Sequence, residues 1–178
     1  MDEMVKELKD IFLEANNELL KKDKLLFDLK VSEGTICGAL MNKIYDRLKN
    51  SSYSDYYVDV EYNRNRNHRK KIKTCYIITN NRYKEITINC DLIVHSRGQN
   101  AKQDNLIAIE MKKSNRLKAE KIDDKYRLIS LTNNNSSLPE HVCKYKLGIY
   151  YEINFNRNTI FLEYYYKGEK ITEDTIKI

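Results

Sequence analysis

Three charged residues stand within or at the end of apolar segments of the chain. Asp91 lies inside the segment 83–94, and Glu110 and Lys112 close the segment 106–112. Side chains alternate along a strand, so Glu110 and Lys112 share one face if 106–112 is a strand. Two carboxylates that converge from neighbouring strands suit Mg²⁺, with water and phosphate completing its shell. If the two strands are adjacent, Asp91 and Glu110 can therefore form a Mg²⁺ site.

The position of Asp91 follows from the same alternation. In the predicted strand 83–94, Cys90 and Leu92 fall on an apolar face and Asp91 on the opposite, polar face. If this strand neighbours 106–111, Asp91 meets Glu110. The alternative is a surface ion pair, because an Asp followed by Glu-x-Lys is common in charged chains. The two strands and the helix that follows them favour the metal site.

The elements that would position these residues can be read from the apolar periodicity. Residues 3–22 and 32–49 have helical spacing, with Ser32 as a plausible N-cap and 23–31 as a connector. A third helix is expected over 116–131, with Ile122, Tyr126 and Ile129 on one side. Strands are expected over 56–62, 74–79, 83–94, 106–111, 146–155 and 159–166. Residues 63–73 read as a polar, basic loop, and 80–82 and 156–158 as turns.

This order, α-α-β-β-β-β-α-β-β, predicts an α/β fold with a central mixed sheet flanked by helices. The length of 178 residues suits one domain. The net charge of +6 favours a polyanionic partner, although a lysine-rich surface alone would give the same value. The four cysteines show no zinc-ligand or disulfide pattern, and no signal peptide or membrane span is recognised. A cytoplasmic location is the expectation.

Several motifs occur together in an order that resembles a known family. The runs 89–98 and 105–114 carry Asp91 and Glu110-Met111-Lys112, and the segments 31–33, 58–64 and 145–150 add further similarity. Over residues 31–153 the chain resembles small bacterial members of the PD-(D/E)XK (restriction-endonuclease-like) nuclease superfamily. Residues 1–30 would then be an N-terminal helical extension and 154–178 a C-terminal strand. Cys90 replaces the proline of the motif name, which supplies no ligand.

The resemblance implies roles for individual residues. Asp91 and Glu110 match the metal-binding acids, and the carbonyl of Met111 would be a further ligand. Lys112 matches the lysine that orients or activates water and stabilises charge on the phosphate. Glu33 matches an acid that binds a second metal, although an acid in a first helical turn is also favoured by the helix dipole. The implied activity is a Mg²⁺-dependent nuclease, more an endonuclease than an exonuclease, with Mn²⁺ able to substitute.

Basic residues supply candidate contacts to nucleic acid, with DNA the expected substrate. The loop 63–73 could grip phosphates or simply be solvated, and other basic residues stand near the proposed site. The candidates are Arg64, Arg66, Arg69, Lys70, Arg97, Lys113 and Arg116. A homodimer is possible, and a membrane is not expected. The alternatives are a catalytically silent nuclease-like domain that binds nucleic acid or protein, and a structural subunit of a defence or mobile-element complex.

Overall fold

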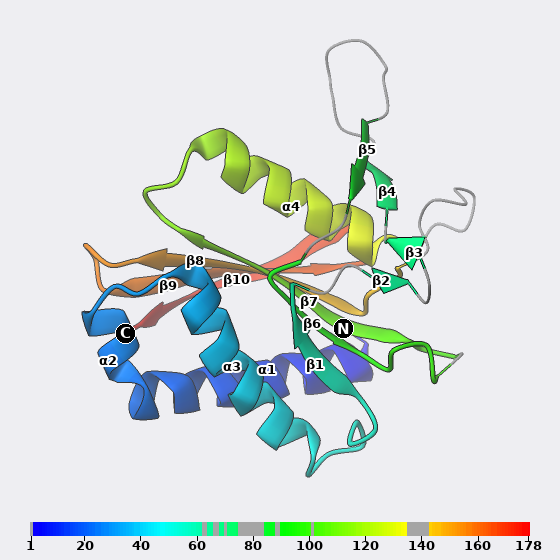
Figure 1. Ribbon diagram of the computed structural model, residues 1–178, viewed down its shortest axis with the longest axis horizontal. Coiled ribbons are helices and arrows are strands. Elements are labelled where there is room, and N and C mark those ends of the chain that lie inside the picture. Colours follow the sequence, from blue (N-terminus) through cyan, green and yellow to red (C-terminus); the bar gives the residue numbers. More distant parts are fainter. Residues whose placement is uncertain are drawn as a thin grey trace.

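A computed structural model describes residues 2–61, 90–100, 102–134 and 143–178 in full, and the backbone alone at 64–65, 68–69, 71–74 and 84–87. Figure 1 shows a twisted central sheet with helices α1 and α3 on one face and α4 on the other. This arrangement confirms the predicted α/β class with a mixed sheet between helices.

The helices begin and end close to where the periodicity predicts. They are α1 (Glu3–Lys22), α2 (Lys24–Asp28), α3 (Glu33–Leu48) and α4 (Lys118–Thr132). Ser32 is the N-cap of α3, since its hydroxyl accepts a hydrogen bond from the Thr35 N–H at 3.1 Å. The prediction that 23–31 is only a connector is wrong, because it contains the five-residue α2. Such a short helix has too few residues to show a period, and the burial of Phe27 holds it in place.

Six strands form the main sheet, in the order β1-β6-β7-β8-β9-β10. The strands are β1 (Tyr57–Val60), β6 (Leu92–His95), β7 (Asn105–Lys113), β8 (Leu147–Asn154), β9 (Thr159–Tyr166) and β10 (Glu169–Lys177). Neighbouring strands are antiparallel except β7 and β8, which are parallel and joined through α4. The buried strand predicted at 106–111 is confirmed as the core of β7. A parallel pair of this kind needs a crossover, which α4 provides.

Four short strands lie outside the main sheet. They are β2 (Arg64–Asn65), β3 (His68–Arg69), β4 (Lys71–Thr74) and β5 (Lys84–Thr87), paired as β2-β3 and β4-β5. The prediction of one strand over 83–94 is wrong, because β5 and β6 belong to different sheets. The predicted loop 63–73 also contains β2, β3 and part of β4, since backbone pairing needs no apolar side chains. The predicted turn 80–82 lies outside the described residues.

The C-terminal segment 154–178 forms all of β9 and β10, rather than one strand. Lys167 and Gly168 join them with φ angles of 52° and 82°, the left-handed conformation of a tight hairpin. The polar residues of β10 obscure its alternation, because the strand is largely exposed.

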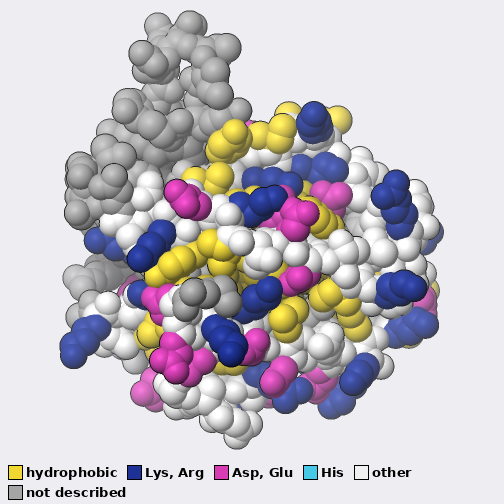
Figure 2. Space-filling model, turned by 180° about the vertical axis from the view of Figure 1, so that it is seen from behind, with side chains coloured by type: hydrophobic (Ala, Val, Ile, Leu, Met, Phe, Trp, Pro, Cys, Tyr) yellow, Lys and Arg dark blue, Asp and Glu magenta, His cyan; other side chains and the backbone are white. Residues whose placement is uncertain are grey.

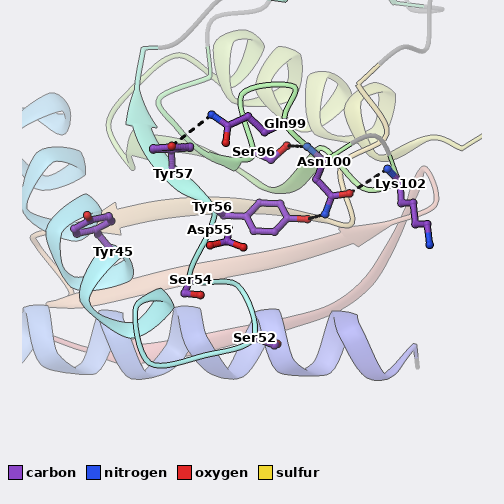
Figure 3. Close-up of a pocket in the computed structure, with 10 residues that line it drawn as sticks. All are labelled: Tyr45, Ser52, Ser54, Asp55, Tyr56, Tyr57, Ser96, Gln99, Asn100 and Lys102. Atoms are coloured by element: carbon purple, nitrogen blue, oxygen red, sulfur yellow. Dashed lines mark hydrogen bonds between the residues drawn. The ribbon is translucent and has the colours of Figure 1, made fainter.

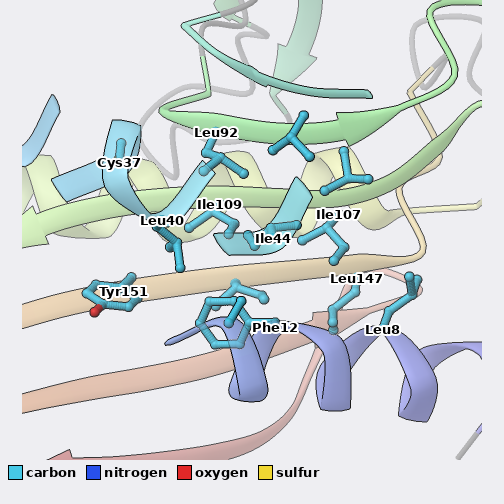
Figure 4. Packing of buried hydrophobic residues seen from close by; sticks show 14 of the residues in the cluster. Leu8, Phe12, Cys37, Leu40, Ile44, Leu92, Ile107, Ile109, Leu147 and Tyr151 are labelled. Carbon is cyan, nitrogen blue, oxygen red and sulfur yellow. The ribbon is translucent and has the colours of Figure 1, made fainter. Parts of the chain in front are cut away.

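The sheet buries different side chains on its two faces. Figure 4 shows the larger cluster, in which Leu8 and Phe12 of α1 and Leu40 of α3 pack toward Ile109 of β7. A smaller cluster lies under α4 and includes Leu128. The two clusters hold the sheet between its helices, so the ends of β6 and β7 have fixed positions. No helix in the described part of the chain is long and apolar enough to cross a membrane.

Candidate active site

The register of β6 and β7 brings the two predicted acids together. Leu92 pairs with Ile109 in this antiparallel ladder, which sets Asp91, one residue earlier, beside Glu110, one residue later. The Met111 N–H donates a hydrogen bond to Asp91 Oδ2 at 2.7 Å. The strands are therefore neighbours, as the predicted site requires.

The backbone bends at Asp91, just before β6 begins. Cys90 consequently packs with Ile93 under α4, and not with Leu92 on the opposite face. The prediction that Cys90 shares a face with Leu92 is therefore wrong. Strict alternation fails here because 90 and 91 precede the paired strand and their backbone does not follow its pleat.

Glu110 and Lys112 both reach α4 from β7. Glu110 is 1% exposed, and its Oε1 accepts a hydrogen bond from Arg127 Nη1 at 2.8 Å. Lys112 Nζ lies 3.0 Å from Asp124 Oδ2 and 4.0 Å from Asp91 Oδ2. Arg127 Nη1 also donates to Asp124 Oδ1 at 3.0 Å. The predicted site is thus a five-residue cluster of two cations and three carboxyl groups.

The sequence pattern does not single out Asp124 or Arg127. It places Ile122, Tyr126 and Ile129 on one side of this helix, but the residues buried in α4 are Asp124, Leu128, Leu131 and Thr132. The i, i+4, i+7 spacing of Asp124, Leu128 and Leu131 is the available signal. A buried acidic side chain on the apolar stripe of a helix needs a charged or hydrogen-bonding partner. The spacing of Asp124 therefore indicates that its side chain meets polar groups of the sheet.

Burial and neighbouring charges shift the ionisation of the cluster. Burial, reinforced by the nearby carboxyl groups, raises the pKa of Glu110 to about 8, although Arg127 acts in the opposite direction. Burial also raises the pKa of Asp91 above its usual range, and the Met111 N–H partly offsets this. Burial alone would lower the pKa of Lys112, but Asp124 and Asp91 outweigh it and raise the pKa. Lys112 is therefore a cation at neutral pH.

Glu33, at the start of α3, contacts the end of β7. Its Oε1 accepts a hydrogen bond from the Lys113 N–H at 2.8 Å, and Arg116 Nε lies 3.3 Å from the same oxygen. Glu33 thus links the helix to the strand that carries Glu110 and Lys112. This contact is compatible with either the structural or the metal-binding role expected of it.

The oxygen donors at this place suit a hard divalent cation. Within the described part of the chain, Glu110 Oε2 is a buried carboxyl oxygen without a hydrogen-bond partner, and Asp91 stands beside it. The Met111 carbonyl, also predicted as a ligand, lies 3.4 Å from Lys112 Nζ. Within the described residues, no group of three or more His, Cys, Asp and Glu has the geometry of a metal centre. A cation held by two carboxylates would complete its shell with water and phosphate oxygens.

The basic candidates divide by position. Lys113 and Arg116 lie beside the site, at the end of β7. Arg97 does not flank it, because Arg97 follows β6 at the end opposite Asp91 and pairs with Asp59 at 2.5 Å. For Arg64 and Arg69 the backbone alone is described, in β2 and β3. Arg66 and Lys70 lie outside the described residues.

A polar pocket of about 640 Å³ lies near Arg97, away from the acidic cluster. Figure 3 shows Asn100 between Tyr56, Ser96 and Lys102, with Asn100 Nδ2 donating to the Tyr56 hydroxyl at 2.8 Å. The Tyr56 hydroxyl in turn donates to the Gln103 carbonyl at 2.6 Å. These bonds fix the loop after β6, and none of the predicted site residues whose side chains the structure describes lines the pocket.

The surface charge is mixed. In Figure 2, Lys and Arg side chains lie among Asp and Glu across the described part of that face and do not merge into one basic patch. The net charge of +6 therefore does not by itself mark a binding face there.

Comparison with known proteins adds no family to these observations. No family model matches the chain, and neither a curated protein nor a solved structure is significantly similar to it.

Proposed function

We propose that this protein is a Mg²⁺-dependent nuclease, an endonuclease acting on DNA, with Asp91, Glu110 and Lys112 in its active site. The observation that carries the proposal is the meeting of these three side chains at one end of β6 and β7. Convergence of two acids and a lysine from separated segments is more informative than their spacing in the sequence.

The order of elements supports assignment to the PD-(D/E)XK superfamily. Apart from the separate strands β2 to β5, the order along this part of the chain is α3, β1, β6, β7, α4 and β8. It consists of a helix, three antiparallel strands of the main sheet, a second helix and a strand parallel to β7. This is the order expected from the resemblance. Fold alone does not establish an activity, so the proposal depends on the site.

Each residue has a role that its environment permits. Asp91 and Glu110 would hold Mg²⁺, with the Met111 carbonyl and Glu33 as further candidate ligands. When bound, the cation would lower the pKa of a coordinated water and offset charge on the phosphate. Lys112, kept cationic by Asp124 and Asp91, would donate to a phosphate oxygen or position the attacking water. The resemblance to the PD-(D/E)XK nucleases implies in-line cleavage that leaves a 5′-phosphate and a 3′-hydroxyl.

Cleavage assays on plasmid, linear duplex, single-stranded DNA and RNA test this proposal. We expect activity that requires Mg²⁺ or Mn²⁺ and is abolished by a chelator. Glu110→Gln and Lys112→Met should each lower the rate by about 100-fold or more, because each removes a charge that acts in the transition state. Glu173→Gln, a change at a half-exposed glutamate of β10, is the matched control and should cleave normally. Cleavage that survives both site changes would contradict the assignment.

A second function is favoured by the burial of Glu110. A carboxyl group that is 1% exposed and bonded to Arg127 could belong to a structural ion-pair cluster in a catalytically silent domain. Such a domain would bind nucleic acid or a protein partner. It would show salt-dependent nucleic-acid binding with no metal-dependent cleavage at any Mg²⁺ or Mn²⁺ concentration.

A further inference from the structure

Two strand residues and two helix residues meet as a chain in which basic and acidic side chains alternate. Glu110 and Lys112 share the α4 side of β7, two residues apart. Asp124 and Arg127 share a face of α4, three residues apart, where helix side chains are neighbours. The resulting order is Lys112, Asp124, Arg127, Glu110, with successive heavy-atom distances of 3.0, 3.0 and 2.8 Å.

We infer that Asp124 and Arg127 are positioning residues, which hold Lys112 and Glu110 in the arrangement that the nuclease reaction needs. This inference rests on the proposed function. Asp124 is 3% exposed and uses one carboxylate oxygen for each cation, Oδ2 for Lys112 and Oδ1 for Arg127. A single side chain of α4 thereby sets the spacing between the lysine and the arginine that contacts Glu110.

Arg127 determines which oxygen of Glu110 is available. Arg127 Nη1 bonds to Oε1, while Oε2 is buried without a hydrogen-bond partner among the residues that the structure describes. The carboxylate is thus held by one oxygen, and the other is left for a cation. In this arrangement Arg127 would act through Glu110, whose Oε1 it contacts. A long arginine side chain fixed at both Asp124 and Glu110 has little freedom to leave.

The inference predicts separate effects for the two helix residues. Asp124→Asn should lower kcat by about 10- to 100-fold with KM nearly unchanged, because Lys112 loses its anchor. Arg127→Gln should weaken Mn²⁺ affinity, measured by calorimetry on the full chain without nucleic acid, by about 10-fold. Asp124→Glu and Arg127→Lys should restore part of each loss. Asp123→Asn and Arg157→Gln, at exposed positions, are matched controls and should leave both quantities unchanged.

The opposite results are equally specific. Tighter Mn²⁺ binding by Arg127→Gln would show that Arg127 competes with the cation, and would overturn the inference. Wild-type kcat and Mn²⁺ affinity in Asp124→Asn and Arg127→Gln would overturn it as well.

Failure of the proposed function can be told apart from failure of the positioning. If the wild-type protein neither cleaves nor binds Mn²⁺, the nuclease assignment fails. The urea midpoints of Asp124→Asn, Lys112→Met and the double variant then test the contact alone. Non-additive midpoint shifts would support the positioning of Lys112 by Asp124, whereas additive shifts would overturn it.

Discussion

Glu110 shows how strongly the surroundings of one residue can change its chemistry. It is 1% exposed, and burial raises its pKa from 4.5 to about 8 even with Arg127 against it. The neighbouring Asp91 and Asp124 add to this shift, because like charges at close range disfavour ionisation. A bound divalent cation would reverse the balance by favouring the carboxylate. Ionisation of the buried Glu110 side chain therefore lowers the stability of the metal-free protein.

This effect can be measured as a change in the free energy of unfolding with pH. The folded protein keeps the Glu110 proton up to about pH 8, whereas the unfolded chain releases it near 4.5. Stability from this group is therefore present at low pH and is lost as pH rises through that window. In chelator-containing buffer, the urea-derived free energy of unfolding should fall less with rising pH in Glu110→Gln than in the wild-type protein. Glu173→Gln should keep the wild-type slope, and identical slopes in all three proteins would contradict the shifted pKa.

Among the elements, β7 was predictable and α4 only partly so. The apolar run 106–111 identifies a buried strand, and its alternation places Glu110 and Lys112 together. The bounds of α4 follow from helical spacing, but its buried face does not, because Asp124 replaces an apolar residue on the stripe. The bend at Asp91 and the two-residue strands β2 and β3 are too short to leave a period in the sequence. The sequence thus predicts the residues of the candidate site that lie on the strands, but it misses Asp124 and Arg127 on α4.

Close packing between α4 and the sheet gives a prediction at the same scale. A Cβ on Gly148 of β8 would lie 3.0 Å from Thr132 Cγ2 of α4 and 3.2 Å from Tyr165 Cβ of β9. Gly148→Ala should therefore lower the free energy of unfolding by about 1–3 kcal/mol. Gly38→Ala in α3 is the matched control, because a Cβ there meets nothing within 4 Å. It should stabilise the protein by up to about 1 kcal/mol through helix propensity. Denaturant titration measures both, and equal stability of the two variants would contradict the close contact.

Over the whole molecule, the site lies at one end of the β6–β7 ladder, and Arg97 and the polar pocket lie toward the other. α3 runs between these ends, with Glu33 at its start and Tyr45, which lines the pocket, in its last turns. On the face shown in Figure 2, the Lys and Arg side chains of the described residues lie among Asp and Glu. Binding of a polyanion should therefore depend on the location of individual cations and not on the total charge.

Salt dependence of nucleic-acid binding tests that distinction. Each phosphate contact contributes a slope of roughly one to the fall of log affinity with log salt concentration. Lys113 and Arg116 stand beside the site, so Lys113→Gln and Arg116→Gln should each reduce the slope by about one, measured by fluorescence anisotropy with a labelled DNA duplex in Ca²⁺ or chelator. Arg97→Gln removes the same charge at the opposite end of β6, away from Asp91 and Glu110, and should leave the slope unchanged. A reduced slope for Arg97→Gln alone would place the nucleic acid at the far end of the sheet, away from Asp91 and Glu110.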